Sequence, residues 1–85
     1  MNNIIEITNL DLYNNQYNEQ ILIDNMHKLS PHSIIKTQDN LSNNFIVKYI
    51  LNKKYAIFRE DYNITLQDIL IYQPNFAKFN PNTIS

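Results

Sequence analysis

The chain contains no glycine among its 85 residues, and this absence excludes several kinds of site. Loops that cradle phosphate groups need glycine for positive φ angles and for close approach of the backbone to the ligand. The sequence therefore holds no Walker A loop, no Rossmann dinucleotide fingerprint and no glycine-flanked nucleophile elbow. Asparagine is the next-best residue for a left-handed conformation, so we expect helices to end at Asn40, Asn52 and Asn75.

Cysteine is also absent, so the chain forms neither disulfides nor thiolate metal sites. No apolar run approaches the roughly 20 residues that a membrane-spanning helix needs. The N-terminal residues lack the basic segment followed by an apolar stretch that is typical of a signal peptide. We therefore expect an intracellular, cytoplasmic protein with no membrane partner, located in the host cell if the source is a virus.

Arginine occurs once, whereas asparagine (15 residues) and isoleucine (14 residues) supply about a third of the chain. Asparagine, isoleucine, lysine and tyrosine have AT-rich codons, and glycine, alanine, proline and arginine have GC-rich ones. The composition is thus typical of an AT-rich genome, such as that of a large DNA virus, a phage, or a low-GC bacterium or protist.

The length and the apolar content predict one small folded domain. A chain of 85 residues leaves no room for a second core, and its aromatic fraction of 12% is too high for a disordered segment. We interpret residues 1–85 as a single domain, with residues 77–85 as an extended tail around Pro81.

Helix starts are the clearest local signal. One short sequence motif, which we call the phrase, recurs along the chain. It consists of an apolar residue, then Ser or Thr, then three variable positions and finally two aliphatic residues. In this phrase Ser or Thr caps the helix, and the apolar residue packs on the fourth helical residue. The phrase predicts helix caps at Ser30, Ser42 and Thr65, with Asn18 as a weaker case. Pro31 fits the first position of its helix, and Asp68 completes a capping box with Thr65.

These starts predict a mainly α-helical domain, a small bundle of about four short helices. The helices are expected at residues 19–29, 31–38, 43–51 and 66–73. Two further segments, residues 3–8 and 55–58, favour extended structure and could pair as a two-stranded β element, which is the α+β alternative. A competing interpretation pairs residues 45–50 with 55–59 as a β-hairpin. The cap at Ser42 favours the helix there.

One longer match joins two of these helices. Residues 34–40 (Ile-Ile-Lys-Thr-Gln-Asp-Asn) resemble residues 69–75 (Ile-Leu-Ile-Tyr-Gln-Pro-Asn) at a spacing of 35. The match indicates either a duplicated helical unit or a coincidence in a chain rich in isoleucine and asparagine.

Residues with catalytic chemistry are few and scattered. His27, His32 and Asp24 could share a metal or an acid–base role, but a solvated face with two surface histidines is the simpler interpretation. Glu60 and Asp61 form an adjacent acidic pair that we interpret as a polar turn. We therefore predict a protein that is not an enzyme and uses no cofactor.

Charge is distributed unevenly along the chain. Residues 1–42 hold five acidic and two basic residues (net −3), and residues 43–85 hold three acidic and five basic residues (net +2). A basic segment interleaved with aromatic residues suits nucleic acid, because cations bind phosphates and rings stack on bases. The candidate nucleic-acid contacts are Lys48, Lys53, Lys54, Arg59 and Tyr55. Four cations are few for such a surface, so this function is our alternative.

Aromatic residues favour a different function, the binding of another protein. Six tyrosines and four phenylalanines exceed what so small a core readily encloses, and tyrosine is enriched at protein interfaces. The candidate interface residues are Tyr49, Tyr72, Phe76 and Phe79. We predict a small accessory or host-modulating domain that binds another protein, either a host protein or a second copy of itself.

Overall fold

The computed structural model describes residues 5–78, and its regular elements there are helical. This confirms the expected mainly α-helical fold. The elements are α1 (Asn9–Asn14), α2 (Glu19–Asp24), α3 (Pro31–Thr37), α4 (Asn43–Phe45), the π-helical turn η1 (Ile46–Ile50) that continues α4, the 3-10 turn η2 (Lys53–Tyr55), α5 (Arg59–Tyr62), α6 (Leu66–Tyr72) and the 3-10 turn η3 (Pro74–Lys78).

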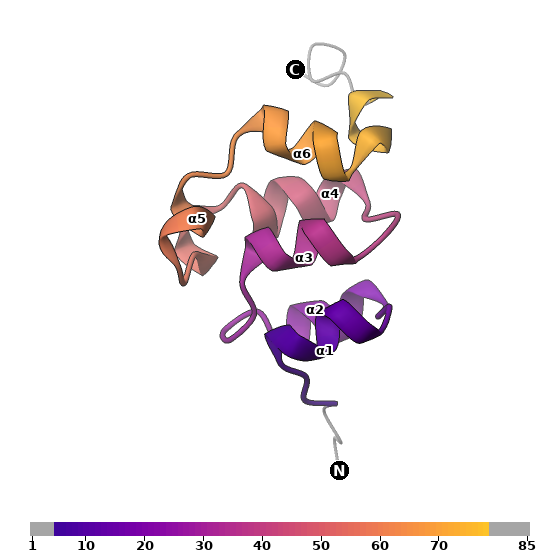
Figure 1. Ribbon diagram of the computed structural model, residues 1–85, viewed down its shortest axis with the longest axis vertical. Coiled ribbons are helices and arrows are strands. Elements are labelled where there is room, and N and C mark those ends of the chain that lie inside the picture. The colour runs from indigo at the N-terminus through magenta and orange to yellow at the C-terminus, as the bar shows by residue number, and fades with distance from the viewer. Residues whose placement is uncertain (1–4, 79–85) are drawn as a thin grey trace.

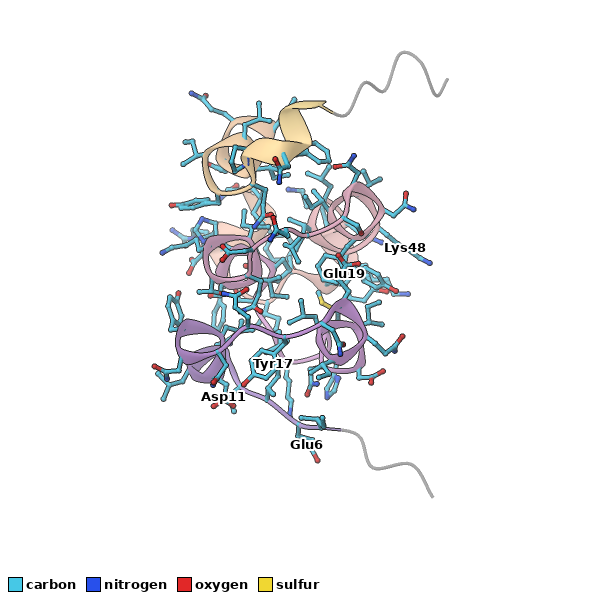
Figure 2. All side chains as sticks on the ribbon, turned by 90° about the vertical axis from the view of Figure 1, so that its right-hand side faces the viewer. Glu6, Asp11, Tyr17, Glu19 and Lys48 are labelled. Atoms are coloured by element: carbon cyan, nitrogen blue, oxygen red, sulfur yellow. The ribbon has the colours of Figure 1, made fainter. Side chains whose placement is uncertain are left out.

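The molecule measures 42 × 28 × 23 Å along its three principal axes. Its helices stack in two columns along the longest of these axes. Helices α1, α3 and α6 lie side by side in one column, which we call the helix row (Figure 1). Helices α2 and α4 form the second column behind them, as the view turned by 90° shows (Figure 2). The apolar core fills the space between the columns and includes Leu22, Ile34, Ile46 and Ile69.

All four predicted caps are present. The side chains of Asn18, Ser30, Ser42 and Thr65 each accept a hydrogen bond from the backbone of the third helical residue. Such a cap stabilises a helix by about 1 kcal/mol. The apolar residues expected to pack across the last three starts are buried in one core cluster: Leu29, Ile34, Leu41, Ile46, Ile64 and Ile69.

One helix was not predicted, and another was predicted too long. Helix α1 begins after Thr8, which caps it through a capping box with Asp11. Thr8 itself has extended backbone angles, in keeping with the extended structure expected up to that residue, and residues 3 and 4 lie outside the described part of the chain. Helix α2 ends at Asp24 instead of continuing to residue 29. The cause is Asn25, which is buried and donates from its amide to the main-chain oxygens of Ile5 and Ile21, both at 2.8 Å.

The β alternatives are not found in the described part of the chain. Residues 45–50 are helical, and residues 53–55 form a 3-10 turn, so neither the hairpin nor the ribbon exists there. The extended backbone at Ala56 and Phe58 instead leads into α5. In place of a partner strand, the N–H groups of Ile57 and Phe58 bind the carboxylate of Asp61.

The asparagine prediction holds in part at one position of three, because Asn40 has a left-handed backbone but α3 already ends at Thr37. Asn40 has a φ of 60°, and no other residue in 5–78 has a positive φ. Asn52 instead caps η2 with its side chain, and Asn75 lies inside η3. Because η3 extends to residue 78, residues 77 and 78 are not extended as predicted, and the rest of the predicted tail lies outside the described residues.

Buried glutamine side chains bind the helix row together. Gln38 follows α3, and its amide Nε2 donates to the main-chain oxygens of Leu12 (3.1 Å) and Asn15 (2.9 Å). Its Oε1 accepts from the backbone N–H of Tyr17 at 2.7 Å. Carbonyl groups at a helix end have no partner within their own helix. Gln38 therefore satisfies the end of α1 from the neighbouring helix.

Gln73 makes the same set of bonds one helix further along. It follows α6, and its Nε2 donates to the main-chain oxygens of Ile35 (3.0 Å) and Gln38 (2.5 Å). Its Oε1 accepts from the N–H of Leu41 at 3.3 Å. In both cases the acceptors are the C-cap residue of the previous helix and the residue three before it. The match at a spacing of 35 thus joins structurally equivalent positions.

We expect Gln73→Ala to lower the free energy of unfolding by about 2–4 kcal/mol, because it leaves buried main-chain groups without partners. Urea unfolding followed by circular dichroism measures this loss. The matched control is Gln67→Ala within α6, where the side chain is exposed and the change should be within about 0.5 kcal/mol. Equal effects of the two substitutions would contradict the role assigned to Gln73.

Candidate functional site

The predicted basic and aromatic segment places two of its four cations beside one cluster of aromatic rings. The ring of Tyr49 lies between those of Phe45 and Tyr55, with centroid distances of 5.2 and 5.3 Å. Lys48 and Lys54 lie over the rings of Tyr49 and Tyr55, at 5.8 and 5.7 Å from the centroids. These rings already have neighbours, so they offer less free area for a nucleic-acid base.

The two remaining cations of this segment differ in their surroundings. The ammonium group of Lys53 donates a hydrogen bond to the main-chain oxygen of Tyr62. Arg59 is exposed and begins α5. The structure therefore brings Lys48 and Lys54 to one tyrosine cluster, and it uses Lys53 to join η2 to α5.

The predicted interface residues do not form one surface. Phe76 is only 6% exposed and belongs to the core, so its place at an interface was wrong. Tyr49 is half-buried in the cluster described above. Tyr72 is exposed and meets His32 edge-on, with ring centroids 6.1 Å apart. Phe79 lies outside the described residues.

A different set of apolar side chains is exposed along the helix row. Leu10 and Tyr13 on α1 are 71% and 56% exposed, and Ile71 on α6 is 64% exposed. Lys36 on α3 occupies the position equivalent to Ile71 and is exposed as well. We give the name row face to these side chains of α1, α3 and α6 together with the contacting pair His32 and Tyr72, so that it comprises Leu10, Tyr13, His32, Lys36, Ile71 and Tyr72.

Two open hollows lie where neighbouring helices of the row end. The first, of about 390 Å³, is between α1 and α3 and is lined by Tyr13, Lys36 and Thr37 among others. The second, of about 310 Å³, is between α3 and α6 and is lined by Asn40, Tyr72 and other residues. Their equivalent places reflect the repeated helix geometry, and each has a tyrosine in its wall.

The acidic pair at residues 60 and 61 is not a solvated turn. Asp61 is 1% exposed, and its carboxylate accepts four hydrogen bonds. The donors are the hydroxyl of Ser30 (2.6 Å) and the main-chain N–H groups of His32 (3.0 Å), Ile57 (2.9 Å) and Phe58 (2.8 Å). One side chain thus joins the start of α3 to the start of α5, which is a structural role.

These hydrogen bonds determine the charge state of Asp61. Burial alone raises the pKa of a carboxyl group, because it removes water from the charged form. The donors from Phe58, Ser30, His32 and Ile57 together outweigh burial and hold the pKa of Asp61 below its ordinary value of 3.8. The group is therefore ionised at neutral pH although it is buried.

The two histidines have separate surroundings. His32 packs against Tyr72, whereas His27 lines a third hollow of about 480 Å³ together with Met26, Lys54 and Ile57, among others. Within residues 5–78, no three histidine, aspartate or glutamate side chains lie close enough to hold a metal ion. None of the helices described is long and apolar enough to cross a membrane.

Comparison with known proteins returned no relative. The chain matches no protein-family model, no curated protein sequence and no solved structure.

We expect the domain to lose stability in acid as Asp61 becomes protonated. Because its pKa is lower in the folded state than in the unfolded state, its contribution is complete above about pH 5 and is lost as the pH falls below about 4. Urea unfolding at a series of pH values measures this dependence.

Asp61→Asn should remove part of the acid dependence and lower the free energy of unfolding at pH 7 by about 2–4 kcal/mol. Asp39→Asn is the control, because Asp39 is exposed and the substitution should leave the stability nearly unchanged. If both variants kept the wild-type acid dependence, Asp61 would not be its source.

Proposed function

We propose that this chain is a non-catalytic protein-interaction module that binds another protein through the row face. An accessory or host-modulating role in a virus, phage or other organism with an AT-rich genome fits this proposal. The observation that carries it is the exposure of Leu10, Tyr13 and Ile71 on the two outer helices of the row, α1 and α6, which both pack against α3.

The row face has the composition of a binding surface. Apolar and aromatic side chains lie at its ends, and the cation Lys36 lies on the helix between them. Tyrosine and large aliphatic side chains anchor protein interfaces when they enter a partner's pockets, and polar neighbours surround them. Stacked helices hold these side chains at fixed spacing, which lowers the entropy cost of binding.

Nucleic-acid binding through Lys48, Lys53, Lys54, Arg59 and Tyr55 is the alternative proposal. It has less support, because the ring of Tyr55 already contacts Tyr49 and Lys54, and because Lys53 is bonded to the main chain of Tyr62. Its signature would be a steep loss of affinity with added salt.

Affinity capture from the native host, with and without nuclease, identifies candidate partners for a direct binding measurement. We expect Ile71→Asp to weaken binding of the captured protein at least about tenfold, since it places a charge in an apolar contact. The matched control is Val47→Asp on η1, which is 47% exposed but belongs to the second column, and it should bind as the wild type does.

Two outcomes would contradict the proposal. In one, Ile71→Asp binds the partner as tightly as Val47→Asp does. In the other, nuclease releases everything that was captured, and reversing the charges of Lys53 and Lys54 abolishes binding, which would support the nucleic-acid alternative.

A further inference from the structure

The third hollow, of about 480 Å³, combines an apolar lining with basic side chains, and we call it the basic hollow. Its apolar lining comes from Ile23, Met26, Tyr55, Ala56 and Ile57. The other two lining residues are His27 and Lys54, and the described part of the chain contributes no acidic residue to the lining. Pockets that bind small molecules measure roughly 300–1,000 Å³ and combine apolar walls with a few polar groups. The basic hollow has this size and composition.

Two buried polar side chains hold the segments that line the basic hollow. Asn25 ends α2 and binds the main chain of the N-terminal segment, so it fixes the turn that carries Met26 and His27. Asp61 accepts from the N–H group of Ile57 at 2.9 Å, so it fixes the extended segment after η2. A site whose walls are fixed before binding loses less entropy when a ligand binds.

Charge and exposure in the basic hollow favour an anion with an apolar body. Ile57 is 40% exposed although it is apolar, so a ligand that covers it removes apolar area from water. Lys54 is exposed, and its ammonium group lies 5.7 Å from the centre of the Tyr55 ring, beside the apolar lining. The acidic residue closest to His27 in the sequence is Asp24, whose carboxylate accepts from the side chain of Gln20 instead.

We propose that the basic hollow binds a small aliphatic carboxylate. The aliphatic chain covers Met26 and Ile57, and the carboxylate accepts hydrogen bonds from Lys54 and His27. A carboxylate matches these two groups because it is negatively charged and accepts hydrogen bonds without donating any. The proposal does not rest on the row face, because none of the residues that line the basic hollow belongs to that face.

The single aromatic residue of the lining argues against a nucleobase as the ligand. A base stacks on a free aromatic face, but the ring of Tyr55 already contacts Tyr49 and Lys54. The remaining apolar side chains of the lining are aliphatic, and a flexible aliphatic chain can follow their surface.

Titration of the full chain with octanoate, followed by the amide signals in NMR spectra, tests the proposal. We expect a Kd on the order of 1 mM, because the chain is short and the hollow is open to solvent. The largest shifts should fall at residues 23–27 and 54–57. The same chain without the charge, 1-octanol, should bind at least about threefold more weakly.

Lys54→Gln should weaken octanoate binding about three- to fivefold, because it removes the charge and keeps most of the side chain. Lys48→Gln is the matched control. Lys48 lies over the ring of Tyr49 at 5.8 Å, much as Lys54 lies over Tyr55, but it does not line the basic hollow, so this variant should bind as the wild type does.

Ala56→Phe should fill the hollow and abolish measurable binding, and circular dichroism checks that the variant folds. If it does not fold, the two lysine variants still decide the question. The absence of localised shifts up to about 10 mM octanoate would overturn the proposal. So would octanol that binds as tightly as octanoate, or equal effects of Lys54→Gln and Lys48→Gln. Ile71→Asp should bind octanoate normally, which separates this proposal from that for the row face.

Discussion

The carboxamide groups of Gln38 and Gln73 hold this fold together in a way that its helices cannot achieve alone. Helices of six or seven residues are too short to be stable in water, so each depends on its neighbours. Each glutamine donates to two carbonyl groups and accepts from one N–H group of the preceding helix pair. These bonds satisfy helix ends that would otherwise be buried without partners, and they set the spacing at which α1, α3 and α6 stack.

Features with local causes could be read from the sequence. A cap and the residue it binds are three positions apart, so the phrases at Asn18, Ser30, Ser42 and Thr65 carried enough information to place four helix starts. The start at Thr8 has the same form, with Ile7 before it and Asp11 three residues after it. It was missed because the isoleucines around it also favour a strand, and the prediction gave this strand propensity more weight than the capping pattern.

Features that depend on distant partners could not be read in this way. Gln38 and Asp61 resemble ordinary polar surface residues, and only the folded chain brings them to groups more than 20 residues away. The candidate site had the same difficulty. Phe76 looked like a surface aromatic but fills the core, while the exposure of Leu10 and Ile71 follows from how the row is stacked. The spacing of 35 was the one sequence signal of that stacking, and it gained meaning only when both glutamines proved to make the same bonds.

The bonds of the two glutamines also form a series. Gln73 donates to the main-chain oxygen of Gln38, and the side chain of Gln38 in turn donates to the oxygen of Asn15. Opening α3 therefore breaks its contacts with both α1 and α6, so the three helices should lose their structure together. Amide hydrogen exchange would report this cooperativity as similar protection of the N–H groups of Tyr17 and Leu41, which belong to different helix pairs. A row of short helices would then behave as a single unit instead of fraying from its ends.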